Sequence, residues 1–262
     1  MFASIKRTMS QAMSLLCLGL LAFNASAAEI QQKGTHLRIQ FDKSVEDEIT
    51  IKGFGFGAVV VIVNAGDPKV FTFVDNISVK GSDLDDSLYV SQSVNIAGTL
   101  KVKSGAGQDN IRISGTFNKN LKLNLGDGDD VLWEHDGETV VGGNYSIKCG
   151  KGDDTVNIWD GMLVYGNMSI DSGPGPGSEH VNAPLELTNG SKHVHKKLSI
   201  KLSKNTPQWT ELDHVTAAKL MIRGGKHYNE ADLSDFDNSF DKTSIKKVDM
   251  VHWPAFVVIE IF

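Results

Sequence analysis

The chain is dominated by a short turn sequence, Gly-x-Gly-x-Asp, that returns with a period of roughly 20–24 residues. The turn occurs at 105–109, 126–130 and 150–154, and a related turn without the acid begins at Gly173. Each copy lies between two short segments in which apolar residues alternate with other residues. This alternation predicts half-buried strands, so the sequence is built from strand–turn–strand units.

A unit of two short strands cannot bury its inward face alone, but units stacked in parallel register, about 4.8 Å apart, can. We therefore predict an all-β fold, a single-stranded right-handed parallel β-helix (solenoid) with roughly 20–24 residues per coil. The clearest repeats span residues 77–185, and diverged coils are expected to cap both ends. Further coils or caps are predicted at Leu37–Phe41, Ile49–Ile51, Val59–Val63, Leu198–Ile200, Leu220–Gly225 and Phe256–Phe262.

The first 27 residues have the features of a secretory signal peptide. Lys6 and Arg7 precede the apolar run Leu15–Phe23, which leads to an Ala-Ser-Ala sequence at 25–27. The apolar run is too short to span a bilayer. We predict a secreted product (periplasm, cell surface or extracellular) without a membrane span, and one parallel β-helix domain over residues 28–262.

The charge and the cysteines exclude two kinds of protein. The formal net charge is −6, and loss of Lys6 and Arg7 with an acid-free signal peptide changes it to −8. This net negative charge argues against nonspecific nucleic-acid binding, which needs a basic surface. Cys149 is the only cysteine after residue 27, so an internal disulfide cannot form and stability must come from the core.

In-register stacking converts sequence spacing into columns of side chains. One inward column is predicted to contain Leu100, Leu121 and Ile147. A second inward column is predicted to contain Leu88, Ile111, Leu132 and Val156. A slip of one residue between coils would turn these side chains outward, so the columns test the register directly.

Two acidic columns are predicted side by side at the turns, Asp86, Asp109, Asp130 and Asp154 in one and Asp85, Asp129 and Asp153 in the other. Carboxylates about 4.8 Å apart repel one another, and Ca²⁺, which prefers carboxylate and carbonyl oxygens, would relieve the repulsion. Alternatively, each aspartate accepts hydrogen bonds from backbone amides of its own turn. The candidate calcium ligands are Asp86, Asp109, Asp129, Asp130, Asp153 and Asp154.

Basic side chains are predicted in two outward columns, Lys80, Lys103 and Lys148 in one and Lys101 and Lys122 in the other. They form either a stripe for an acidic polysaccharide or a solvated face that discourages edge aggregation.

Aromatic side chains mark a third outward column, which contains Tyr89, Arg112 and Trp133, with Trp159 nearby. This column is either a cation–π stack that steadies the coils or a platform on which a sugar ring stacks.

Two short motifs contain residue types that bind transition metals. His193 and His195 lie on one face of a predicted strand, but the sequence identifies no third ligand for them. The sequence Glu134-His135-Asp136 is equally suggestive. The alternative for both motifs is an ordinary surface role.

At Gly126–Leu132 and Gly150–Val156 the chain resembles bacterial secreted solenoids with haemolysin-type calcium-binding repeats. The resemblance covers about residues 77–185 and implies calcium bound at the turn aspartates. In that family the motif recurs in tandem about every nine residues, whereas here it occurs once per coil. This spacing indicates a wider parallel β-helix with calcium-like turns.

The signal peptide and the repeat favour a secreted or surface-exposed structural or adhesive solenoid, with extracellular polysaccharide or envelope components as candidate partners. The sequence contains no nucleophile elbow, phosphate loop or complete metal-ligand set. The alternative is an extracellular polysaccharide lyase or hydrolase that uses residues such as Asp130, Asp154, Lys103 and Arg112 on an outer face. A third possibility is a secretion substrate whose partner is another chain.

Overall fold

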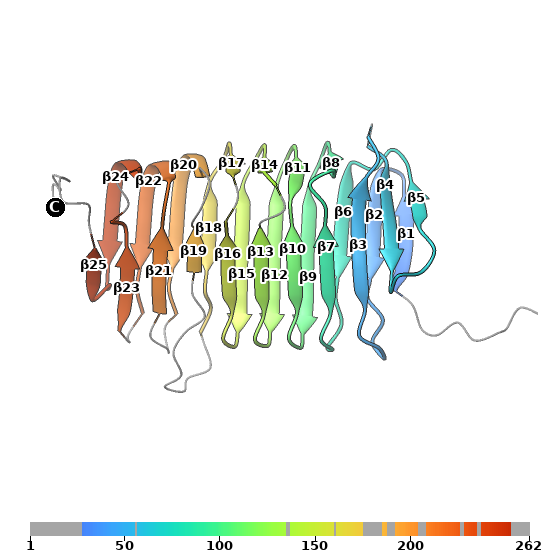
Figure 1. The fold of residues 1–262 in the computed structure, drawn as a ribbon, viewed down its shortest axis with the longest axis horizontal. Coiled ribbons are helices and arrows are strands. Elements are labelled where there is room, and N and C mark those ends of the chain that lie inside the picture. Colours follow the sequence, from blue (N-terminus) through green and yellow to red (C-terminus); the bar gives the residue numbers. More distant parts are fainter. Residues whose placement is uncertain are drawn as a thin grey trace, which may run out of the picture.

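The computed structural model describes residues 28–55, 57–134, 137–159, 161–174, 185–187, 192–203, 208–225, 228–234 and 237–252. In these ranges every regular element is a strand, and most strands stack in parallel along one axis into an elongated solenoid (Figure 1). The predicted all-β parallel β-helix is confirmed. The predicted signal peptide, residues 135–136 and the run 256–262 lie outside the described residues.

The coils have three faces. Face 1 contains β2 (His36–Gln40), β6 (Asn76–Lys80), β9 (Leu100–Ala106), β12 (Leu121–Asp127), β15 (Tyr145–Lys151) and β18 (Met168–Asp171). Face 2 contains β3 (Glu48–Gly53), β7 (Ser87–Val90), β10 (Asn110–Ile113), β13 (Val131–Glu134), β16 (Thr155–Ile158), β19 (Leu185–Leu187), β21 (Gln208–Leu212), β23 (Asn229–Asp232) and β25 (Met250–His252). Face 3 contains β8 (Asn95–Ile96), β11 (Gly115–Phe117), β14 (Thr139–Val141) and β17 (Met162–Val164).

Three long strands join faces 3 and 1 in the C-terminal coils. These strands are β20 (Lys192–Lys201), β22 (Val215–Arg223) and β24 (Ser239–Lys246). The first part of β20 pairs with β17 of face 3, and its second part pairs with β18 of face 1. A register shift between Val194 and Lys197 replaces the corner that earlier coils make at this place.

The N-terminal end of the solenoid is closed by antiparallel strands. The strand β1 (Glu29–Lys33) pairs with β2, and β4 (Val59–Val63) and β5 (Lys69–Phe71) extend face 2 from β3. The prediction that Val59–Val63 forms a further coil was therefore wrong. The chain reverses between β3 and β4 at Gly55 and Gly57, both at positive φ, so the apolar run folds back onto β3 and covers an edge that would otherwise be exposed.

The observed register fixes the core. Leu88, Ile111, Leu132 and Val156 form the predicted inward column. The other column differs from its prediction, because Leu100 and Leu121 are followed by Tyr145, and Ile147 stands instead beside Leu123. The coil between β12 and β15 adds 24 residues rather than the 26 that the prediction required. A tyrosine therefore occupies an inward position that the apolar pattern assigned to isoleucine.

Glycine is required where the strands of face 1 end. A Cβ atom on Gly126 would lie 1.9 Å from the carbonyl oxygen of Gly105 in the preceding coil, and one on Gly150 would lie 1.7 Å from that of Gly126. Successive turns thus touch through their backbones and leave no room for a side chain. Gly126 also has a φ of +110°, which other residues rarely adopt.

A second corner, between faces 3 and 1, contains a ladder of asparagines that the sequence analysis did not identify. The amide of Asn144 donates to Oδ1 of Asn120, and the amide of Asn167 donates to Oδ1 of Asn144, both at 2.9 Å. Asn76 accepts in the same way from the amide of Thr99. Each side chain thereby satisfies a backbone donor of the next coil that the bend removes from the sheet.

We predict that Gly126→Ala lowers the free energy of unfolding by about 3 kcal/mol or more, because the added methyl meets backbone that cannot move aside. The matched control is Gly34→Ala. Gly34 also has a positive φ, +59°, but has open space around its Cβ position. Its loss should be roughly 1 kcal/mol. Chemical denaturation measures both, and equal losses would contradict the close-contact argument.

Candidate functional site

The inner acidic column forms a hydrogen-bonded ladder inside the corner between faces 1 and 2. Asp86, Asp109, Asp130 and Asp154 are all buried, with exposed fractions of 2, 1, 0 and 8%. The amide of Asp86 donates to Oδ1 of Asp109 at 2.8 Å, and the same bond recurs from Asp109 to Asp130 at 2.8 Å and from Asp130 to Asp154 at 3.2 Å. The predicted column is correct, and its members bond the backbone of the preceding coil.

The ladder has a fifth member that the sequence analysis missed. The amide of Asp47 donates to Oδ1 of Asp86 at 3.0 Å, and Asp47 is itself 2% exposed. Its carboxylate accepts from the amide of Asp42 and from the side chain of Asn64. Asp47 precedes Asp86 by 39 residues because β4 and β5 are inserted between them, and this spacing hid it from a search for the regular period.

Burial raises the pKa of three carboxyl groups in the ladder. The pKa of Asp109 rises to about 6, that of Asp130 to about 8 and that of Asp154 to about 7, chiefly because loss of water disfavours the charged form. The carboxylates of neighbouring aspartates raise each value further. The Oδ2 atoms of all three have no hydrogen-bond partner among the described residues. Protons thus neutralise much of the ladder near neutral pH.

The outer acidic column faces solvent and also bonds the backbone. Oδ1 of Asp85 accepts from the amide of Gln108 at 2.7 Å, and Oδ1 of Asp129 accepts from the amide of Asp153 at 2.8 Å. In the part of the chain that the structure describes, no three His, Cys, Asp or Glu side chains form a metal-binding group. Both columns therefore bond backbone amides, as the alternative expected, but the amides of these bonds belong to the adjacent coil rather than to the same turn. Calcium binding at these residues stays a prediction.

The predicted lysine columns lie on face 1. Lys80 stands beside Lys103, Asn124 connects Lys103 to Lys148, and Lys101 pairs with Lys122. The structure extends these columns along the whole stack and adds a third beside them. We call the resulting surface the cationic face, which consists of Arg38, Lys80, Lys101, Lys103, Lys122, Lys148, Lys197, Lys201, Lys219, Arg223, Lys242 and Lys246.

The cationic face contains twelve of the 26 lysines and arginines of an acidic chain. Two acidic side chains stand in these columns among the described residues. Asp171 pairs with Lys201 at 2.6 Å, and Glu29 stands beside Gln40 at the N-terminal edge. Two hollows open on this surface, one of about 200 Å³ beside Lys80 and Lys103 and one of about 250 Å³ between Lys148 and Lys201. The face is therefore strongly positive and uneven enough to admit ligand groups between its side chains.

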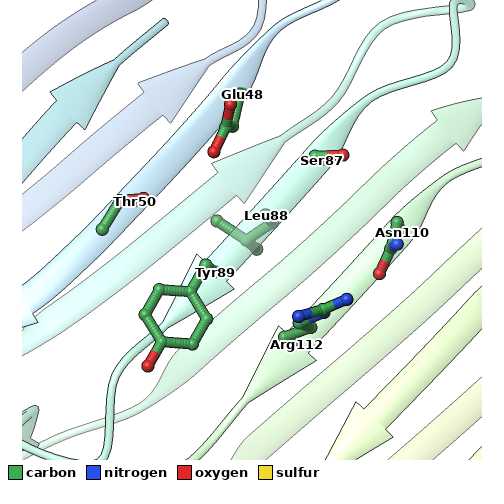
Figure 2. A pocket seen from close by; sticks show the side chains of 7 residues that line it. All are labelled: Glu48, Thr50, Ser87, Leu88, Tyr89, Asn110 and Arg112. Atoms are coloured by element: carbon green, nitrogen blue, oxygen red, sulfur yellow. The ribbon is translucent and has the colours of Figure 1, made fainter. Parts of the chain in front are cut away.

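The aromatic column lies on face 2 as predicted. Arg112 pairs with Tyr89 on one side and with Trp133 on the other. The rings of Trp133 and Trp159 meet edge to face, with centroids 5.0 Å apart. Tyr89 and Arg112 line a groove of about 410 Å³ with Glu48, Thr50, Ser87, Leu88 and Asn110 (Figure 2). The predicted platform thus continues into a concave site toward the N-terminal end of face 2.

The residues named for a polysaccharide lyase or hydrolase are not brought together. Asp130 and Asp154 lie inside the corner, Lys103 belongs to face 1 and Arg112 to face 2. A substrate on one outer face could not contact all four. Their expected convergence was wrong, because alternation along each strand and the corners between strands separate them.

The two histidines lie on face 3. His193 forms a hydrogen bond with Oγ1 of Thr216, and the ring of His195 lies 4.7 Å from that of Tyr165. Both histidines line a hollow of about 390 Å³ that also contains Asp241. Of the other predicted motif, His135 and Asp136 lie outside the described residues.

Glu134 belongs to a polar cluster in the core that sequence reasoning missed. It occupies an inward position of face 2 and is 2% exposed, while Tyr145 and Lys192 are fully buried. The hydroxyl of Tyr145 donates to Oε1 of Glu134. Burial raises the pKa of Glu134 to about 7, although Tyr145, the hydroxyl of Thr139 and the charge of Lys192 act in the opposite direction. The cluster links side chains of all three faces inside the solenoid.

Comparison with protein-family models, curated proteins and solved structures finds no match to this chain. The described residues include no helix with the length and apolarity needed to cross a membrane. The function must therefore be argued from the surfaces above.

We predict that Asp130→Asn flattens the dependence of stability on pH. An unfolded aspartate ionises near pH 4, whereas folded Asp130 ionises near 8, so between these values the folded state holds an extra proton and loses stability as the pH rises. The melting temperature of the wild type should fall by roughly 5 °C or more between about pH 5 and about pH 8.5. Asparagine keeps the Oδ1 acceptor but does not titrate, so the melting temperature of the variant should fall less over the same pH range.

The control for this experiment is Asp241→Asn, which changes an exposed aspartate of β24 outside the corner that contains the ladder and should leave the pH profile unchanged. Identical profiles for Asp130→Asn and the wild type would contradict the assignment of the titration to the ladder.

The calcium prediction is tested by calorimetric titration of chelator-treated residues 28–262 and by melting near pH 8 with and without the ion. Bound calcium should release or absorb heat and raise the melting temperature, since a ligand that binds only the folded state stabilises it. Asp129→Asn combined with Asp153→Asn should remove both effects. Neither heat nor a shift in the wild type would contradict calcium binding.

We predict that Tyr145→Phe destabilises the protein by about 1–3 kcal/mol, because it leaves the buried carboxyl of Glu134 without its hydrogen-bond donor. Adding Glu134→Gln should recover part of the loss, giving a coupling energy of about 1 kcal/mol in a double-mutant cycle. Tyr165→Phe is the matched control, because Tyr165 is 47% exposed. Strictly additive losses would show that the two side chains do not act together.

Proposed function

We propose that this chain is a secreted or surface-exposed structural and adhesive β-solenoid that binds an acidic polysaccharide through the cationic face. The observation that carries the proposal is the concentration of twelve lysines and arginines on one face of an acidic chain. Random placement of charge would distribute them over all three faces.

The arrangement of the cationic face suits a long, regularly charged polymer. Along a column the side chains are separated by the rise of one coil, about 4.8 Å, and neighbouring columns are about 7 Å apart. A flexible polyanion laid along the face meets at least one positive charge at every coil from β2 to β24 except that of β18, where Asp171 occupies the column. Affinity then arises from many weak contacts, each screened by salt, rather than from one pocket.

Binding to a uronic-acid polymer such as alginate tests the proposal, with dextran as the neutral comparison. The variant replaces Lys101, Lys103 and Lys122 together with glutamate. We expect the wild type to bind alginate but not dextran, and to lose affinity steeply with added salt. The variant should bind at least about tenfold more weakly at low salt, because three attractive contacts become repulsive.

The matched control replaces Lys52, Lys69 and Lys119 with glutamate. These lysines are exposed but lie outside the cationic face, so the net charge changes equally while the surface remains intact. Equal losses in the two variants would show that only total charge matters and would refute a binding face. Equal binding of alginate and dextran by the wild type would refute the proposal that the ligand is a polyanion.

A further inference from the structure

The groove on face 2 is built from two rows of outward side chains that the register places side by side. Glu48, Ser87 and Asn110 form one row across β3, β7 and β10. Thr50, Tyr89 and Arg112 form the other. Figure 2 shows these side chains around the hollow, with Glu48 on β3, Arg112 on β10 and Tyr89 on β7, the strand between them. The small side chain of Ser87 leaves the centre of its row open.

The polar groups of this groove are not neutralised by one another. The carboxylate of Glu48 and the guanidinium of Arg112 form no ion pair or hydrogen bond with other described residues. Their strands are two positions apart, about 10 Å, with β7 between them. An acid and a base therefore face one hollow with their bonding capacity unused.

We propose that this groove binds one carboxylated sugar unit, a hexuronate, at a site separate from the cationic face. The guanidinium of Arg112 matches a carboxylate with two parallel hydrogen bonds. The ring of Tyr89 offers an apolar surface to the C–H face of a pyranose. Glu48 accepts hydrogen bonds from ring hydroxyls at the opposite end.

Other ligand classes leave part of the groove unused. An inorganic anion would satisfy Arg112 but would be repelled by Glu48, and a neutral sugar would leave the guanidinium without an anion. An apolar ligand would bury Glu48 and Asn110 without hydrogen bonds, which is unfavourable. The volume of about 410 Å³ lies in the lower part of the range found for small-molecule sites and suits a short saccharide rather than a polymer.

The experiment titrates the full mature chain with disaccharides of glucuronate, galacturonate and mannuronate, and with the neutral disaccharide of galactose. Calorimetry and backbone NMR shifts give the affinity and the location. At least one hexuronate disaccharide should bind, with shifts confined to β3, β7 and β10, and the galactose disaccharide should bind at least about tenfold more weakly. Arg112→Lys keeps the positive charge but removes the guanidinium that makes two parallel hydrogen bonds, so it should weaken binding about tenfold. Glu48→Gln should also weaken binding while leaving the fold intact.

The variant with Lys101, Lys103 and Lys122 changed to glutamate separates this site from the cationic face. This variant should bind alginate much more weakly but should bind the hexuronate disaccharide as the wild type does. The proposal for the cationic face and the proposal for the groove can therefore fail independently. Hexuronate binding in the groove is refuted if no hexuronate disaccharide binds or if the galactose disaccharide binds equally well. It is also refuted if the lysine variant abolishes hexuronate binding while Arg112→Lys and Glu48→Gln leave that binding unchanged. Circular dichroism and thermal melts establish that each variant is folded.

Discussion

Backbone hydrogen bonds between coils hold each residue directly beside its counterpart in the next coil, and the rest of the structure follows from this register. Leu121 lies between Leu100 and Tyr145, and Arg112 lies between Tyr89 and Trp133. Because the bonds are made by backbone atoms, they impose the same alignment on apolar, charged and aromatic side chains. A residue type that repeats once per coil therefore becomes a continuous column, in the core or on the surface.

This register explains how much the sequence could predict. Regular spacing between Asp86, Asp109, Asp130 and Asp154 was sufficient to place them in one column, and the lysine and aromatic columns follow from the same period. Prediction failed where an event interrupts the period. An antiparallel turn at Gly55 and Gly57 begins the insertion of β4 and β5, which caused the wrong assignment of Val59–Val63 and hid Asp47. The asparagine ladder was not predicted, because asparagine also occurs at many turns that form no ladder.

The core cluster was hidden for a different reason. Alternation predicts that Glu134 points inward, but a carboxyl at an inward position is unfavourable unless it finds a donor. That donor, Tyr145, is contributed by a strand of another face, and Lys192 by a third. Contacts across the interior join positions that the coil period does not relate. The contact between these residues therefore could not be predicted from the spacing of the sequence.

The corners show how the fold accommodates charge in its interior. A bend removes backbone amides from the sheet, and an aspartate in the next coil supplies the acceptor that each amide needs. Repetition of this solution brings carboxyl groups together out of water, which raises the pKa of Asp130 to about 8. The acceptor oxygen is needed but the negative charge is not, so protonation relieves the repulsion without breaking the ladder.

No such structural need accounts for the cationic face. Lysines stacked about 4.8 Å apart repel one another by roughly 0.9 kcal/mol per pair even in water. Lys101 and Lys122 are neighbours of this kind, as are Lys80 and Lys103, and their exposed side chains contribute little to the core. Serines occupy the same column at Ser146, Ser169 and Ser199 without disturbing the register. The fold would therefore be more stable with fewer lysines here, and the polyanionic partner that we propose would convert this repulsion into binding energy.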